Sequence, residues 1–122
     1  MATMDIIERE DVLGHLRRVA PRFRERLAAL EASPIIGDAR GVGLLGCLEG
    51  LTAGRHKPLG VQRDLGARLD SGCEARGLIL RPLINMAVFP PPLVISEAEI
   101  DGMFEIFEDA EAEVAAAIAA GG

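Results

Sequence analysis

Apolar residues recur at helical spacing over the first thirty residues of the chain. They lie three, four or seven positions apart, at Ile6, Leu13, Leu16, Phe23, Leu27 and Leu30. This spacing predicts a helix that ends at Ser33 and Pro34. Asp11 could cap a new start of the helix after a break. Pro21 predicts a kink or a new first turn, because proline has no amide hydrogen to donate.

The middle of the chain changes to shorter patterns. The run ARGVGLLGCLEGL at 39–51 predicts one strand. Its glycines indicate a bulge or a close approach by another part of the backbone. The polar stretch TAGRHKPLG at 52–60 predicts a loop.

A second helix is predicted by three apolar residues on one face, at Leu65, Leu69 and Cys73. Gly77 can end this helix in a left-handed cap. LIL at 78–80 and MAVF at 86–89 then predict two short strands joined around RPLIN.

The last pattern begins with SEAE, a capping box in which Ser96 caps the helix and Glu99 reaches back. The helix should continue through Ile100, Met103, Phe107, Val114 and Ile118. The order of elements is therefore helix, strand, helix, two strands, helix. It predicts a single α+β domain over 1–122, with a small antiparallel or mixed sheet covered by helices.

Composition and charge narrow the classes of partner. A hydrophobic content of 49% in 122 residues is enough for one packed core. The net charge of -6 argues against a nucleic-acid partner, and the arginines at 17–26 are interpreted as a solvated helix face. The charged opening MATMDIIERE is unlike a secretory signal, and no apolar run reaches the length of about 18 residues that could span a bilayer. We expect no membrane partner and a cytoplasmic location.

Cysteine, histidine and acidic residues form no recognisable catalytic or metal motif. Cys47 and Cys73 lack metal-type spacing, and we expect both to be buried, reduced thiols. His15 and His56 are interpreted as ordinary surface groups, and Glu49 as an exposed strand end. No metal site is predicted.

Arg81 is the unusual residue, because it places a charge between two apolar runs. It could pair with an internal carboxylate, extend its guanidinium into water, or bind an anionic ligand. The guanidinium matches a carboxylate through two parallel hydrogen bonds, and Pro82 would stiffen the turn that directs it. Asp70, Glu74 and Glu97 are the candidate internal partners.

Two stretches together resemble a known family. DARGVGLLGCLEG at 38–50, followed by RGLILRPLINMAVFPPPLVISEAEIDGMFEIFEDA at 76–110, resembles the C-terminal small domain of class III pyridoxal-phosphate-dependent aminotransferases, the ω-aminotransferase group. The resemblance covers roughly 4–118. It implies the fold of that domain in fold-type I pyridoxal-phosphate enzymes, an α+β unit with a three- or four-stranded sheet covered by helices.

The resemblance also implies roles for two arginines. Arg81 occupies the position of the family arginine that can face the active site and hold a substrate carboxylate. Arg40 is expected at the strand entrance or at a contact with another domain, with a direct ligand role as the less favoured alternative. The family's Schiff-base lysine lies upstream in a large domain that is absent here, and Lys57 matches no lysine of the family motif.

The resemblance thus implies the C-terminal part of an amino-group-transferring enzyme, which contributes substrate-carboxylate binding and domain closure. Pyridoxal phosphate is expected in the intact enzyme and none on this chain alone, which holds no catalytic residue and should be inactive by itself. Its partner would be the missing cofactor-binding domain or further copies of this chain, because uncovered apolar surface and strand edges invite association. The alternative is a stand-alone, non-catalytic α+β module for binding or oligomerisation.

Overall fold

The computed structural model describes residues 2–50 and 64–121. In these ranges the chain forms four α-helices, one short 3₁₀ helix and four strands, which confirms the predicted α+β class. The four strands make one antiparallel sheet with the order β1-β2-β4-β3. The elements are α1 (Ala2–Arg9), α2 (Val12–Ala29), η1 (Leu30–Ala32), β1 (Ile36–Val42), β2 (Leu45–Gly50), α3 (Leu65–Glu74), β3 (Arg81–Leu83), β4 (Met86–Phe89) and α4 (Glu97–Ala119).

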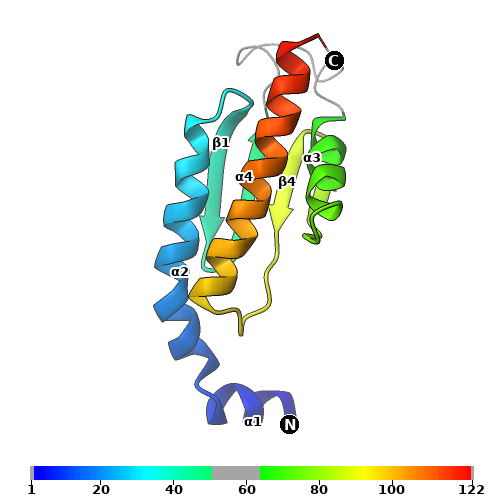
Figure 1. Ribbon diagram of the computed structural model, residues 1–122. Helices are drawn as coiled ribbons and strands as arrows, with labels where there is room; N and C mark the ends of the chain where they lie inside the picture. Colours follow the sequence, from blue (N-terminus) through cyan, green and yellow to red (C-terminus); the bar gives the residue numbers. More distant parts are fainter. Residues whose placement is uncertain (1, 51–63, 122) are drawn as a thin grey trace.

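The described helices cover one face of the sheet. Figure 1 shows α2, α4 and α3 side by side in front of the strands, while α1 lies beyond the end of the sheet. Because side chains alternate between the two faces of a strand, every second residue points away from these helices. We call that surface the open face; its residues are Asp38, Arg40, Val42, Leu45, Cys47, Glu49, Arg81, Leu83, Met86 and Val88.

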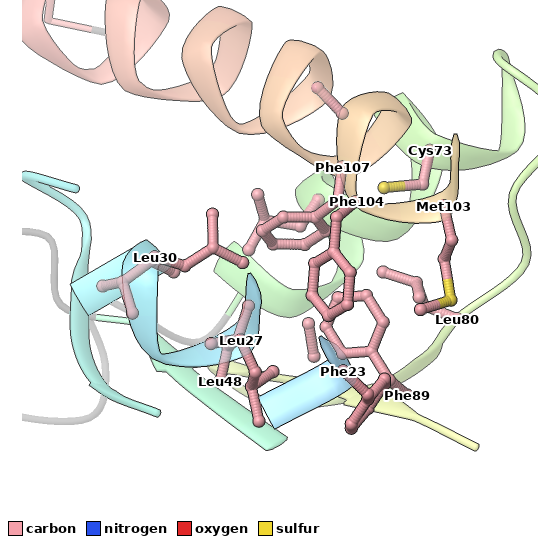
Figure 2. Packing of buried hydrophobic residues seen from close by; sticks show 14 of the residues in the cluster. Phe23, Leu27, Leu30, Leu48, Cys73, Leu80, Phe89, Met103, Phe104 and Phe107 are labelled. Atoms are coloured by element: carbon pink, nitrogen blue, oxygen red, sulfur yellow. The ribbon is translucent and has the colours of Figure 1, made fainter. Parts of the chain in front are cut away.

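The core lies between the sheet and the helices and is built around four phenylalanines. Figure 2 shows Phe23 of α2, Phe89 of β4, and Phe104 and Phe107 of α4 packed together. The Phe104 ring centroid lies 5.5 Å from that of Phe23 and 5.3 Å from that of Phe89. Aliphatic side chains such as Leu48 fill the rest, so the composition of the core follows the predicted apolar stripes.

The N-terminal helical pattern folds as two helices. Asp11 separates them with a left-handed backbone (φ 49°), and its carboxylate accepts a hydrogen bond from the amide of Gly14 at 3.2 Å. The predicted cap at Asp11 is therefore confirmed. Helix α2 is continuous through Pro21, so no new helix begins there, and the helical stretch ends at Ser33.

The single strand predicted over 39–51 is wrong, because the chain folds back within it. Val42 pairs with Leu45, and the two-residue turn between them begins at Gly43 with a φ of 57°. Positive φ at this position of a hairpin turn favours glycine. The predicted close approach at a glycine is confirmed at Gly46, where an added Cβ would lie 2.9 Å from the Phe23 ring.

The strand predicted at 78–80 is also wrong, because the third strand starts three residues later, at Arg81. Helix α3 ends as predicted: Gly77 has a φ of 88°, and the amide of Leu78 donates to the carbonyl of Cys73 at 2.9 Å. This cap reverses the chain before it reaches the sheet. The predicted strand at 86–89 is confirmed as β4.

The predicted capping box at the start of α4 is present. The Ser96 hydroxyl accepts from the amide of Glu99 at 3.1 Å, and the Glu99 carboxylate accepts from the amide of Ser96 at 3.1 Å. The hydrogen bond from the Ser96 amide, and then the nearby Ser96 hydroxyl, lower the pKa of the Glu99 carboxyl. The box fixes where the long α4 begins after Pro90, Pro91 and Pro92.

An ion pair joins α2 to α4 on the outer surface and makes stability depend on pH. Asp101 accepts two hydrogen bonds from Arg22, at 2.8 and 3.2 Å, which lower its pKa. A lowered folded pKa adds stability above the unfolded value of about 4, and this stability is lost as the pH falls through the folded pKa. We expect Asp101→Asn to reduce stability at neutral pH and to weaken the dependence of stability on pH in the acid range. Urea unfolding at neutral and acid pH measures both, with Glu105→Gln as the exposed control on the same helix.

Candidate functional site

One row of side chains crosses the open face from edge to edge. Arg40 of β1 pairs with Cys47 of β2, Cys47 pairs with Val88 of β4, and Val88 pairs with Arg81 of β3. Cross-strand partners point to the same side of a sheet, so these four side chains share the open face. With strands about 4.8 Å apart, the two arginines stand roughly 14 Å from each other.

Arg81 is the first residue of β3, and the fold fixes its backbone from both sides. On one side its pairing with Val88 sets its place in the sheet. On the other side the amide of Leu80 donates to the carboxylate of Asp70 on α3 at 3.3 Å. Asp70, which was a candidate ion partner for Arg81, thus holds the backbone just before Arg81.

The turn between β3 and β4 adds further support. Its first residue, Ile84, has a φ of 56°, which is unusual for a β-branched residue. The Ile84 carbonyl accepts from the amide of Gly66 in α3 at 3.0 Å. The next residue, Asn85, is buried: its side-chain amide donates to the Gly50 carbonyl at 3.0 Å, and its carbonyl accepts from the Gly50 amide at 2.8 Å. The hairpin that carries Arg81 is therefore fastened to both α3 and β2.

The Arg81 side chain is exposed and makes no ion pair with any residue in the described ranges. None of the three candidate carboxylates, Asp70, Glu74 and Glu97, is bonded to it. The guanidinium can therefore offer its donors to an anion from outside these ranges, and it suits the planar, two-oxygen geometry of a carboxylate.

Arg40, at the other end of the row, is in the opposite electrostatic state. Its guanidinium pairs with Asp38 and with Glu49, the latter at 3.1 Å, and lies 3.8 Å from the sulfur of Met86. The hydrogen bonds that Arg40 donates to Asp38 and Glu49 raise its pKa. Because its charge is already matched, Arg40 is a poor receptor for a further anion.

The two cysteines differ in burial. Cys73 is completely buried, as predicted, and burial raises its pKa to about 11. The prediction that Cys47 is buried is wrong, because it is half-buried on the open face, where desolvation still raises its pKa. Side chains in an apolar run that forms a strand alternate between faces, so apolar neighbours in the sequence did not place Cys47 in the core.

The remaining residues considered from sequence have structural places or lie outside the described ranges. His15 is half-buried rather than an ordinary surface group, and its Nε2 donates to the carbonyl of Ile95 at 2.7 Å. Glu49 is not an isolated, exposed strand end, because its carboxylate pairs with Arg40. His56 and Lys57 lie outside the described residues, as does the predicted loop at 52–60.

The described residues provide no attachment point for an aldehyde cofactor such as pyridoxal phosphate and no ligand cluster for a metal ion. The only lysine of the sequence is Lys57, so the described ranges offer no side-chain amine that could link such a cofactor. The same ranges contain no cluster of three or more histidine, cysteine or acidic residues arranged to hold a metal ion. Nor is any described helix long and apolar enough to cross a membrane.

Comparison with known proteins gives consistent matches over nearly the whole chain. The family model for class-III aminotransferases matches residues 1–110. The uncharacterized aminotransferase y4uB of Sinorhizobium fredii is 37% identical over 89% of this chain, and a probable gamma-aminobutyrate transaminase 4 of Oryza sativa is 34% identical over 90%.

Among solved structures, an omega-transferase from Vibrio fluvialis is 36% identical, with a TM-score of 0.88 over 95% of this chain. A PLP-bound aminotransferase mutant from Vibrio fluvialis is 33% identical, with a TM-score of 0.84 over 93%. The chain spans only about a quarter of these proteins: 23 and 24% of the two sequence relatives, and 28 and 25% of the two solved chains.

Proposed function

The chain belongs to the class-III aminotransferase family, and we propose that it is the C-terminal part of a pyridoxal-phosphate-dependent aminotransferase in which Arg81 binds the carboxylate of the substrate. One observation carries the role of Arg81: an exposed guanidinium, rigidly placed at the edge of the sheet, has no ion-pair partner among the described residues. We further propose that 1–122 is a single domain and that its movement against the rest of the enzyme helps to close the site.

Arg81 would act by binding and orientation. Two charge-assisted hydrogen bonds to a carboxylate fix both the position and the plane of that group. Holding the substrate this way lowers the entropic cost of bringing its reacting atoms to the catalytic groups. Pyridoxal phosphate supplies the electron-withdrawing chemistry of the family when it is bound. Because the described residues offer no amine to link it, we place the cofactor in the rest of the enzyme and propose none on this chain alone.

A stand-alone binding or oligomerisation module is the less favoured function. The family match extends over residues 1–110. A module that had lost the chemistry would have no need for an unpaired arginine, yet Arg81 is held in place by α3 and by the β3–β4 hairpin.

We propose a cytoplasmic enzyme, although some of the matched relatives are named as mitochondrial. We also propose that the intact enzyme is a homo-oligomer and that it acts on carboxylate-bearing amines or keto acids.

The chain by itself is expected to show no transaminase turnover with added pyridoxal phosphate and an amine donor. Nucleophilic activation of a lysine requires desolvation or a neighbouring cation, and the polar sequence around Lys57 supplies neither in an obvious way. Keto-acid consumption followed by chromatography measures this. Turnover that Lys57→Ala abolishes would contradict the proposal that the catalytic lysine lies elsewhere.

The role of Arg81 can be measured in a chimera in which this chain replaces the matching C-terminal segment of the Vibrio fluvialis enzyme. Arg81→Ala should lower kcat/KM for carboxylate-bearing substrates by about 10- to 100-fold, since a hydrogen bond to a charged group contributes about 1.5–3 kcal/mol. Amines without a carboxylate should be used as before.

In the isolated chain, Arg81→Ala should change stability by less than about 0.5 kcal/mol, because it removes an exposed side chain without an ion pair among the described residues. Arg17→Ala, an exposed arginine of α2, is the control for a general loss of positive charge. A large loss of stability, or equal losses for substrates with and without a carboxylate, would mark Arg81 as a structural residue.

A further inference from the structure

The outer edge of β1 is open, and one carboxylate lies on it. Figure 1 shows β1 as an outermost strand of the sheet, beside α2. The amide of Ala39 points away from β2 and donates to the Glu31 carboxylate at 3.1 Å. In an antiparallel strand, residues two apart direct their backbone groups to the same side, so Gly41 also presents its amide and carbonyl to this edge. A groove between α2 and β1 runs over the same residues, and Pro21 and Ala28 line its other side.

The opposite edge of the described sheet is a poor place for another strand to pair. It is formed by β3, which has only three residues. The middle one, Pro82, has no amide hydrogen to donate. An exposed edge strand is a template for pairing with another chain, and β1, with seven residues, is the better template of the two.

The β1 edge is complementary to itself when two copies meet about a two-fold axis at Ala39. In that register the outward amide of Ala39 would donate to the Ala39 carbonyl of the second copy, and symmetry would supply the reverse bond. Gly41 would lie opposite Gly37 of the second copy, where neither residue has a side chain to obstruct the pairing. Arg40 would lie opposite Asp38 of the second copy, and this pair would occur twice. Opposite charges directly across two strands stabilise their pairing.

Glu31 competes with such pairing for the same donor. Its carboxylate accepts from the Ala39 amide, so a second strand can bond to Ala39 only after Glu31 has left. Glu31 is exposed, and water can replace its hydrogen bond at a small net cost. Proteins limit edge-to-edge association by covering an edge or by placing charged side chains on it.

We propose that the β1 edge is a surface for antiparallel pairing with the β1 edge of a second copy of this chain, and that the Glu31 carboxylate limits this pairing by occupying the Ala39 amide. The second copy is the occupant because the edge matches itself in its backbone donors and acceptors and in the charges of Asp38 and Arg40. The pairing is independent of the proposed role of Arg81, which lies on β3 at the opposite edge of the sheet.

Sedimentation equilibrium over a range of protein concentrations measures the association. The 122-residue chain should form a reversible dimer. Glu31→Ala should lower the dissociation constant of that dimer by at least about fivefold, because each of the two copies loses one competing hydrogen bond. Glu105→Ala, at an exposed acidic residue of α4, is the matched control and should leave the dissociation constant unchanged.

Ala39→Pro removes the shared donor and should abolish the dimer. Proline is tolerated on an edge strand where its nitrogen faces away from the neighbouring strand, so the pairing of β1 with β2 should persist. Circular dichroism shows whether the variant is folded.

Charge variants test the register without adding a proline. Arg40→Asp places like charges opposite each other and should raise the dissociation constant by at least about threefold. Adding Asp38→Arg restores the opposite-charge pair between the copies, and the new arginine faces Glu49 across β1 and β2 of its own chain. The double variant should therefore dimerise as the parent chain does.

Three results would overturn the proposal. The first is a monomer for both the parent chain and Glu31→Ala at the highest soluble concentration. The second is a dimer that Ala39→Pro leaves intact but that Leu83→Asp, at an exposed residue of the open face, dissociates, because the contact would then lie on the face. The third is a double charge variant that is folded but remains monomeric, because the edges would then not meet at Ala39.

Discussion

Replacing Phe104 by alanine is expected to destabilise the fold by about 3–5 kcal/mol. Phe104 is fully buried at the centre of the layer between α4 and the sheet. Its ring contacts those of Phe23 and Phe89, and the guanidinium of Arg26 lies over it at 5.9 Å. The substitution would leave a cavity bordered by three elements. Small domains have a total stability of about 5–15 kcal/mol, so a large share of molecules would unfold at moderate temperature.

Urea unfolding followed by circular dichroism measures the loss. Phe104→Leu keeps most of the volume and should cost less. Ile106→Ala, at a half-buried residue of the same helix, tests whether any apolar truncation in α4 has the same effect. A cost below about 1 kcal/mol for Phe104→Ala would mean that the core can collapse around the missing ring.

The layer architecture could be predicted from sequence because helical spacing and end signals act locally. The caps at Asp11, Gly77 and Ser96 were all identified, and each depends on residues within a few positions of it. The first hairpin was missed because its turn carries no such local signal. Its turn, at Gly43 and Leu44, is apolar and lacks the polar residues that mark most turns, and Leu44 is itself buried in the core.

The boundary of the third strand depended on contacts that are distant in sequence. LIL at 78–80 has strand-like residues, but the amide of Leu80 bonds to Asp70 in α3 instead of to a neighbouring strand. Pairing begins at Arg81, where Val88 lies opposite. Residue propensity therefore predicted a strand next to the observed one, but three residues too early in the chain.

Arg81 was singled out in the sequence by its motif and by the charge between apolar runs, but whether its guanidinium is paired or exposed was left open, and the open face was not predicted. That face is defined by which side of each strand the helices cover, and this follows only from the assembled sheet. Arg40, Cys47 and Val88 stand in one row with Arg81 although they come from three other strands. Spacing in the sequence contains no direct signal of such a row.

Gly66 links α3 to the hairpin that carries Arg81. Its amide donates to the Ile84 carbonyl at 3.0 Å. A Cβ on Gly66 would lie 2.7 Å from that oxygen and 2.6 Å from the Met86 carbonyl oxygen, and backbone atoms cannot rotate away as a side chain can. Gly66→Ala should therefore push the β3–β4 turn from α3 and cost about 1–3 kcal/mol, although alanine normally favours a helix.

Gly102→Ala in α4 is the matched control, because no described atom lies within 4 Å of the Cβ it would add. Helix propensity alone should then raise stability by about 0.5–1 kcal/mol. Opposite signs for the two Gly→Ala variants in urea unfolding would show that contact with the hairpin, not helix propensity, decides the effect at Gly66. In the chimera, Gly66→Ala should also weaken the use of carboxylate substrates, since Arg81 moves with the hairpin. If both variants stabilise the chain, α3 does not hold the hairpin in place, and the rigid positioning of Arg81 has to come from its pairing with β4 alone.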